Sequence, residues 1–131
     1  MVIPLFPLPT TVFYPNTFLP LHIFEPRYRS MVADALEGEG KIGMILLKAG
    51  WEKDYHGTPE IMTIGCVGKI ERHSQLPEGK YNILLSGLHR FRILQEIEGK
   101  LYRQAQVELL EEINDQNLTD ESLSIKKRVI K

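Results

Sequence analysis

Residues 25–36 read EPRYRSMVADAL and decide the first element of the fold. A proline directly after an acidic residue, as in Glu25-Pro26, is typical of a helix start, because the first turn does not need the N–H that proline lacks. Apolar side chains then recur at helical spacing on a single stripe formed by Tyr28, Met31, Val32, Ala35 and Leu36. Gly38 and Gly40 follow as a stop signal. The pattern predicts a helix over residues 26–36 that packs one face against a core.

On the N-terminal side of this helix, the first twenty residues contain five of the eight prolines in the chain. Because proline fixes φ and lacks an N–H, this stretch cannot form a helix and makes a poor central strand. Bulky apolar residues fill the gaps between the prolines, whereas a flexible linker would be polar. We therefore expect short extended pieces separated by turns, with their side chains buried.

On the C-terminal side, the apolar period changes to that of β-strands from residue 41 to about residue 110. Strand patterns cover residues 41–47, 61–72, 91–97 and 101–110. In addition, residues 69–76 and 80–86 are expected to pair as a hairpin. Gly65 and Gly68 indicate a bulge or a close backbone approach, and Gly87 is expected to open a turn. Strands so close in sequence favour an antiparallel meander that closes into a barrel or half-barrel.

The last part of the chain changes character again. Residues 108–121 contain six acidic residues and no basic residue, which indicates a solvated connection. Thr119 or Asp120 suits the cap of a further helix that starts near Glu121. We therefore divide the chain into a β-rich domain over residues 1–112 and an acidic connection with the start of a C-terminal helix over residues 113–131.

The composition is that of one globular domain. The chain has 131 residues, of which 43% are hydrophobic and 25% charged, and its net charge is −1 at pH 7. This balance argues against a general binder of polyanions. The single cysteine, Cys66, cannot form an internal disulfide, and no apolar run is long enough to span a membrane. With no signal-peptide pattern at the start of the sequence, we expect a cytoplasmic domain with no membrane partner.

Several classes of enzyme are excluded by the absence of their motifs. The sequence contains no Walker A motif, no G-x-G-x-x-G, no G-x-S-x-G and no H-E-x-x-H. Cys66 has no acid–base partner at informative spacing, although His22, His73 and His89 occur in the chain, so cysteine catalysis is disfavoured. The same dispersed residues match no metal-ligand spacing. We expect no catalytic residues, no metal and no cofactor.

Four segments form a distinctive set: residues 3–8 (IPLFPL), 19–29 (LPLHIFEPRYR), 76–83 (LPEGKYNI) and 87–93 (GLHRFRI). Together they resemble the N-terminal LON domain, which is the substrate-binding domain of the ATP-dependent protease La (Lon) and also occurs in standalone bacterial LON-domain proteins. The resemblance extends over about residues 1–112. It implies a mainly β fold similar to PUA-like pseudo-barrels, built of antiparallel strands with one packed helix. In longer members a helical lobe follows, which would here begin near Asp120 and be truncated.

The resemblance also implies a function. The carried-over role is the recognition of protein substrates, through exposed or unfolded polypeptide segments, and in some members self-association. The family's ATPase and serine–lysine protease domains have no counterpart in these residues. The resemblance therefore implies a non-catalytic module whose partners are protein substrates or other polypeptides.

The most specific of these segments supplies most of a candidate binding surface. The candidate polypeptide-binding residues are Phe24, Glu25, Arg27, Tyr28, Arg29 and Arg90. Arginine and tyrosine are enriched at binding hot spots, and exposed apolar residues between positions 5 and 24 are suited to line a groove for extended peptides. We predict such a groove beside the first helix, with charged residues at its rim. The alternative is architectural, with Glu25 starting the helix and the arginines pairing with nearby acids or buried carbonyl groups.

Two further alternatives belong to other classes of protein. Residues 61–104 carry seven Lys or Arg against four Glu, with Tyr81, Phe91 and Tyr102 between them. RNA-binding surfaces combine cations and aromatic side chains in this way, so the basic face over residues 80–103 is an alternative RNA site. Strand alternation would instead turn the aromatic rings inward, which argues against a nucleic-acid partner. The remaining alternative is a structural oligomerisation domain.

Overall fold

The structure is a computed structural model, and it describes residues 1–10, 13–54 and 57–110. Within these ranges it contains α1 (Pro26–Glu37), β1 (Val2–Leu8), β2 (Phe18–Ile23), β3 (Lys41–Leu46), β4 (Ile64–Gln75), β5 (Tyr81–Ile97) and β6 (Gln104–Leu109). Short 3-10 turns occur at Trp51–Asp54 and Pro77–Gly79. The predicted mainly β fold and its helix are confirmed. The predicted C-terminal helix and the division after residue 112 lie outside the described residues.

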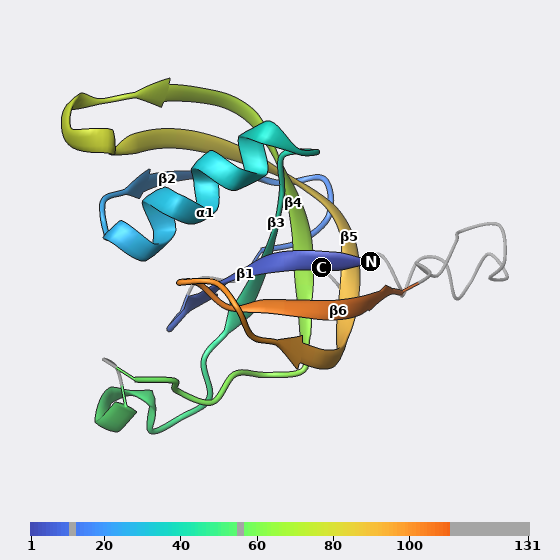
Figure 1. Cartoon of the computed structure of the whole chain (residues 1–131). Coiled ribbons are helices and arrows are strands. Elements are labelled where there is room, and N and C mark those ends of the chain that lie inside the picture. The colour runs from blue at the N-terminus through green and yellow to red at the C-terminus, as the bar shows by residue number, and fades with distance from the viewer. Residues whose placement is uncertain (11–12, 55–56, 111–131) are drawn as a thin grey trace, which may run out of the picture.

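The strands form one sheet that closes into a barrel (Figure 1). Their order is β2-β5-β4-β3-β1-β6, and an additional pairing of β5 with β6 closes the ring. β3, β4, β5 and β6 follow one another antiparallel, which confirms the predicted meander for this part of the chain. β5 serves two partners on one edge, because residues 81–86 pair with β2 and residues 91–97 pair with β6. β2 therefore lies outside the ring as an added edge strand.

β1 is a central strand, which corrects the expectation that the proline-rich start makes a poor one. It pairs in parallel with β3 through residues 5–8 and antiparallel with β6 through residues 2–4. Leu5 donates its N–H toward β6, to the carbonyl oxygen of Arg103 at 2.8 Å, and successive residues of a strand face opposite sides. Pro4 therefore turns its nitrogen toward β3 before that ladder begins. Pro7 turns its nitrogen toward β6 beyond the last pair, so neither ladder loses a hydrogen bond.

Gly87 lies inside β5 and opens no turn, contrary to the prediction. β5 continues from Tyr81 to Ile97, and its register with β4 shifts close to this glycine. A Cβ at Gly87 would collide with the carbonyl oxygen of Tyr14, whose backbone packs against it. The Gly87 N–H donates to the carbonyl oxygen of Thr17 at 2.8 Å. The glycine is therefore required by a close backbone approach.

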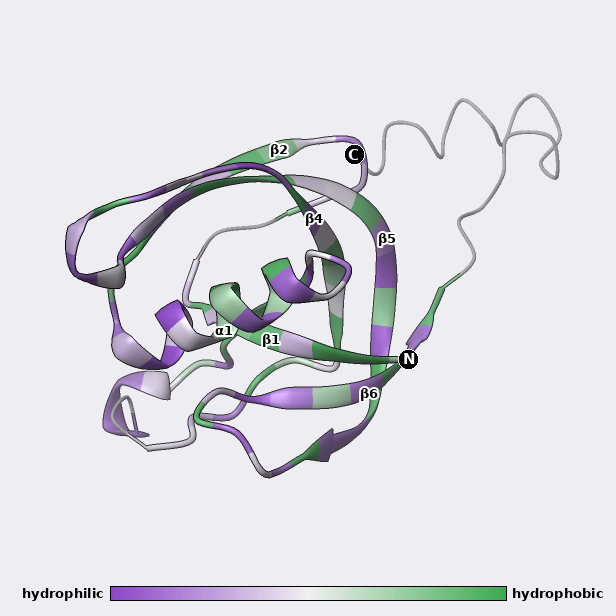
Figure 2. Ribbon diagram, turned by 45° about the horizontal axis from the view of Figure 1, so that its top comes forward, coloured by the Kyte–Doolittle hydropathy of each residue, from purple (hydrophilic) through white to green (hydrophobic). Residues whose placement is uncertain are grey.

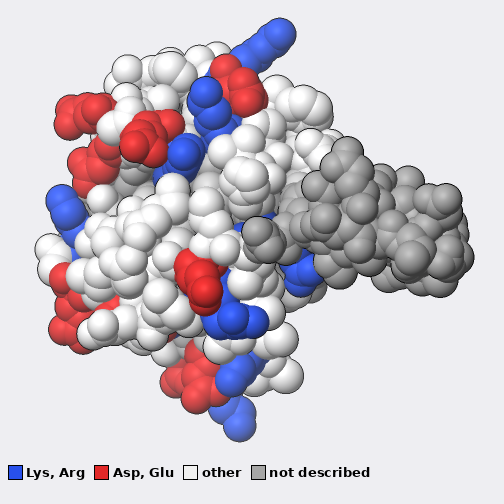
Figure 3. All heavy atoms as spheres, turned by 90° about the vertical axis from the view of Figure 1, so that its right-hand side faces the viewer, with Lys and Arg blue, Asp and Glu red and all other residues white. Residues whose placement is uncertain are grey.

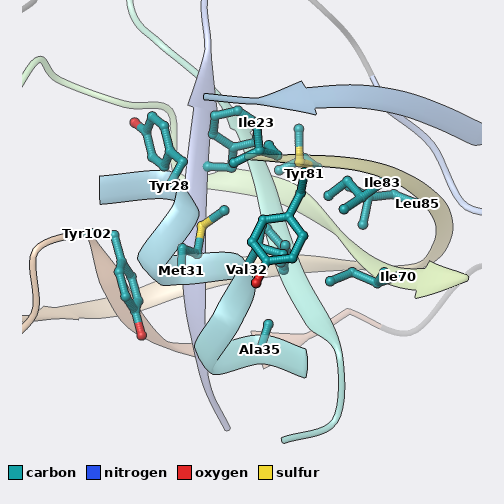
Figure 4. Packing of buried hydrophobic residues seen from close by; sticks show 13 residues of the cluster. Ile23, Tyr28, Met31, Val32, Ala35, Ile70, Tyr81, Ile83, Leu85 and Tyr102 are labelled. Carbon is teal, nitrogen blue, oxygen red and sulfur yellow. The ribbon is translucent and has the colours of Figure 1, made fainter. Parts of the chain in front are cut away.

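Two clusters of buried side chains lie on opposite faces of β1 and β3. The first packs under α1 and includes the predicted helix stripe residues Tyr28, Met31, Val32 and Ala35 (Figure 4). The second fills the barrel around Phe91, which is fully buried. β1 places Leu5 in the barrel cluster and Phe6 in the helix cluster, so both of its faces are covered. In contrast, hydrophobic and hydrophilic residues alternate along β5 (Figure 2).

Candidate functional site

A groove of about 1150 Å³ opens beside the start of α1. Its walls are the end of β1, the junction of β2 and α1, the turn at Trp51, residues 57–59, and the segment over residues 96–103. The large apolar side chains of the lining are Phe6, Leu8, Leu21, Ile23, Phe24, Leu47, Trp51 and Leu101. A concave lining of this kind, with a few charged groups, is typical of a binding site.

Four of the six predicted binding residues line this groove, namely Phe24, Glu25, Arg27 and Tyr28. Phe24 is 55% exposed and stacks on His22, with 5.7 Å between the ring centres. Arg27 Nε lies 3.1 Å from Glu25 Oε1, and the guanidinium lies over the Tyr28 ring at 4.7 Å from its centre. Tyr28 itself is buried. This side of the groove therefore presents an exposed aromatic ring, that of Phe24, and two charged side chains, Glu25 and Arg27, that neutralise each other.

The same residues also start the helix, as the architectural alternative expects. Glu25 is the N-cap residue in an extended conformation, and its carbonyl oxygen accepts the N–H groups of Tyr28 and Arg29 at 3.0 and 2.9 Å. Its carboxylate makes no capping hydrogen bond and pairs with Arg27 instead. The short segment that begins at Glu25 thus both starts α1 and lines the groove.

Arg29 and Arg90 lie away from the groove. Arg29 extends toward the tip of the β4–β5 hairpin, where Nη1 donates to the carbonyl oxygen of Glu78. Arg90 lies in β5 opposite Cys66 and borders a separate hollow of about 230 Å³. The structure therefore does not bring the six predicted residues together at one site. Among the predicted apolar residues of the N-terminal segment, Phe6 lines the groove, whereas Phe18 is 65% exposed elsewhere on β2.

The sequence interpretation missed several groove residues from the second half of the chain. Leu101 lines the groove and is 74% exposed, and Glu98 and Tyr102 contribute to the same wall. Trp51, the single tryptophan of the chain, lines another wall. The sequence marked this region only as the short connection between the strand patterns over residues 91–97 and 101–110, and such a connection does not tell which surface it borders.

Tyr102 connects the wall of the groove to the helix. Its ring is buried, and its hydroxyl donates to Oδ2 of Asp34 in α1 at 2.6 Å. Burial, together with the hydrogen bond to Asp34 and the negative charge of this carboxylate, raises the pKa of Tyr102 well above its ordinary value. Lys100 Nζ lies 3.8 Å from the same carboxylate oxygen. The segment before β6 is therefore held against α1 (Figure 4).

Three other features that bear on function are the metal-binding side chains, the cysteine and the helix length of the described residues. Residues 1–10, 13–54 and 57–110 contain no group of three or more His, Cys, Asp or Glu side chains that could hold a metal ion. Cys66 is buried, as expected for a cysteine in an apolar strand. No helix within these ranges is both long and apolar enough to cross a membrane.

The basic face proposed for RNA presents no aromatic rings for stacking. Tyr81 and Phe91 are buried in β5, as strand alternation predicted, and Tyr102 is buried in the segment before β6. Several of the basic residues are paired with acids, including Arg92 with Glu108 at 3.6 Å. On the face shown in Figure 3, basic and acidic side chains are interspersed and form no continuous basic patch. These observations favour the interpretation that the charged side chains of residues 80–103 form a solvated surface and do not form an RNA site.

The described residues thus form a closed β-barrel with one packed helix and an apolar groove at the helix start. A family model described as the ATP-dependent protease La (LON) substrate-binding domain matches residues 2–131. The chain belongs to this family. The resemblance noted from the sequence is thereby confirmed.

Curated relatives agree with this assignment. The Lon protease of Dictyoglomus thermophilum is 37% identical over 112 residues, which cover 85% of this chain and 14% of the relative. The Lon protease of Trichlorobacter lovleyi is 33% identical over 125 residues, which cover 93% of this chain and 15% of the relative. This chain therefore spans about 15% of the length of such relatives.

Solved structures show the same fold. A Lon N-terminal domain protein from Xanthomonas campestris superimposes with a TM-score of 0.71 at 24% identity, covering 99% of this chain and 74% of that chain. The N-terminal domain of the Mycobacterium avium complex Lon protease gives a TM-score of 0.68 at 16% identity, covering 99% of this chain and 70% of that chain. At these identities the likeness establishes the fold alone.

Proposed function

We propose that this chain recognises protein substrates by binding exposed or unfolded polypeptide segments in the groove beside α1. Membership of the substrate-binding family supports the general role. The observation that carries the proposal is the groove itself, where Phe24 and Leu101 leave 55% and 74% of their surfaces exposed beside an apolar hollow. Large apolar side chains grouped in this way favour contact with another apolar surface over contact with water.

The mechanism is capture without chemistry. The apolar lining removes apolar side chains of the bound segment from water, while the fixed Glu25–Arg27 pair borders the site. Ordering a flexible segment has an entropic cost that a small groove only partly offsets, so the affinity of one module is modest. Self-association, or attachment to further domains, would raise the apparent affinity by presenting several grooves together.

The first experiment is a binding titration with matched phenylalanine variants. A fluorescently labelled, permanently unfolded polypeptide is titrated with the full chain, and anisotropy is recorded at low and high salt. Saturable binding that persists at high salt is expected, because apolar contacts are little screened, whereas RNA-like electrostatic binding would fall steeply with salt. Phe24→Ser is expected to weaken binding by about 5- to 30-fold, corresponding to the ~1–2 kcal/mol of a hot-spot side chain.

Phe18→Ser is the matched control. Phe18 is even more exposed than Phe24, at 65% against 55%, but it does not line the groove. Its replacement is expected to leave the binding constant within about twofold. Absence of binding by the unmodified chain at high micromolar concentration would refute the proposal, and equal losses in both variants would refute the groove as its site. A mass that depends on concentration without any binding would favour the oligomerisation alternative.

A further inference from the structure

Leu101 is an exposed side chain on a firmly held backbone. It is 74% exposed and lies between Lys100 and Tyr102, whose side chains both contact the Asp34 carboxylate of α1, at 3.8 and 2.6 Å. The next residue, Arg103, donates to the carbonyl oxygen of Pro59 at 2.6 Å. The backbone that carries the leucine is therefore held in position before any ligand arrives, which reduces the backbone entropy lost on binding.

Charges around the groove are neutralised in pairs, with one exception. Glu25 pairs with Arg27 at 3.1 Å, Glu96 pairs with Arg103 at 3.0 Å, and Lys100 is held by Asp34. Glu98 also lines the groove and is exposed, and among the described residues it takes part in no ion pair. The Glu98 carboxylate is thus the uncompensated charge of this lining, and it lies three residues before Leu101 on the same wall.

We propose that the groove selects extended segments in which a bulky apolar side chain adjoins a lysine or arginine. Leu101 and Phe24 contact the apolar side chain, and Glu98 pairs with the neighbouring cation. This inference rests on the proposed function and adds the class of segment that is preferred. The occupant follows from charge complementarity, since a basic residue satisfies Glu98, whereas an acidic residue in the same place is repelled.

The two contacts contribute to different properties of binding. Burial of the apolar side chain supplies most of the affinity and depends little on salt. An exposed ion pair in water is weak and is screened by salt, so Glu98 supplies selectivity of only a few fold. The preference for a basic neighbour should therefore be clear at low ionic strength and small at high ionic strength.

The test uses two labelled, unstructured peptides that differ at one position. Each carries a single leucine in a polar sequence, followed by lysine in one peptide and by glutamate in the other. The unmodified chain is expected to bind the lysine peptide about three- to fivefold more tightly at low salt, with the ratio falling toward one at 0.5 M salt. Glu98→Lys is expected to reverse the preference.

Glu37→Lys is the control for net charge. Glu37 ends α1, is exposed and does not line the groove, so its replacement changes the charge of the chain equally without altering the site. It is expected to keep the preference for the lysine peptide within about twofold of the unmodified chain. Identical behaviour of the two charge variants would overturn the assignment to Glu98, as would equal binding of both peptides by the unmodified chain.

The apolar contact is tested by a second matched pair. Leu101→Ser is expected to weaken binding of both peptides about five- to tenfold, whereas Leu94→Ser is expected to leave it unchanged. Leu94 is 57% exposed and does not line the groove. If the two leucine variants bind alike, the role of Leu101 is refuted. If an unfolded polypeptide binds but neither peptide does, the inferred selectivity fails while the proposed function stands; if nothing binds, both fail.

Discussion

Tyr102 carries a polar group into a buried position and satisfies it with a single well-placed carboxylate. Its hydroxyl donates to Asp34 at 2.6 Å, and the two residues are 68 positions apart in the chain. Because the hydroxyl loses water on folding and faces a negative charge, the neutral form is favoured and the pKa of Tyr102 is raised. The hydrogen bond joins α1 to the groove wall that carries Leu101.

Replacing Tyr102 with phenylalanine isolates this hydrogen bond. Tyr102→Phe is expected to lower the free energy of unfolding by about 1 kcal/mol at pH 7, since the ring remains and Asp34 regains water. A raised pKa in the folded state means that the stabilisation is complete below the unfolded value of about 10 and is lost as the pH rises above it. Urea unfolding at pH 7 to 11 should therefore show the difference between the two chains shrinking above pH 10. Equal stabilities at pH 7 would contradict this account.

β2 is an edge strand whose open side is interrupted by proline. Thr17 directs its carbonyl oxygen toward β5, where it accepts the Gly87 N–H at 2.8 Å. By strand alternation, Pro20 faces the open edge, so the middle of that edge has no N–H to offer. A proline at this place discourages pairing with another strand. β2 therefore has a proline that blocks its open edge, while the residues where β2 meets α1 line the groove.

Removing the proline should expose the edge. Pro20→Val is expected to increase concentration-dependent association relative to the unmodified chain, because a β-branched residue with a free N–H completes the row of donors. Sedimentation velocity over a range of concentrations would measure the change. Pro4→Val is the control, since β1 already has a partner on each side. Unchanged sedimentation of the Pro20 variant would show that other features keep the edge unpaired.

Among the helices and strands, the sequence predicted features that depend on neighbouring residues and missed those that depend on residues far apart in the chain. The helix and the meander from β3 to β6 were predictable because apolar period and turn residues act within a few positions. The central position of β1 depends on its pairing with β6, about a hundred residues away, which no local pattern records. The groove was predicted only on the side of Phe24 to Tyr28 for the same reason. Leu101 reaches it through the closure of the barrel.

The whole molecule is organised around β1 and β3, which separate two cores. Leu5 is fully buried in the barrel cluster, whereas Phe6 and Met44 belong to the cluster under α1. A strand covered on both faces needs a near-continuous apolar sequence, and β1 reads VIPLFPL. Because both cores share this wall, we expect them to be lost together on unfolding.

Shortening a side chain in the shared wall tests that expectation. Leu5→Ala is expected to lower the free energy of unfolding by about 2–5 kcal/mol, as for other fully buried leucines. Val2→Ala, three residues earlier in β1 at a position that is 50% exposed, is expected to change it by less than about 0.5 kcal/mol. Native-state hydrogen exchange in urea should show that the amides around Met31, in the cluster under α1, and around Phe91, in the barrel cluster, open in a single transition in both variants. Separate transitions would mean that the two cores unfold independently.

The pairing of β1 with both β3 and β6 also has a consequence for biosynthesis. Val2 of β1 is opposite Gln106 of β6, so β1 receives its second partner from a strand that is made about a hundred residues later. At about 5–20 residues per second, a ribosome needs roughly 5–20 s to complete the interval between them. During that time the nascent chain presents Ile3 and Leu5 without the barrel that buries them. Until β6 has been made, β1 is therefore an apolar strand with one edge unpaired, and only the later closure of the barrel removes its side chains from water.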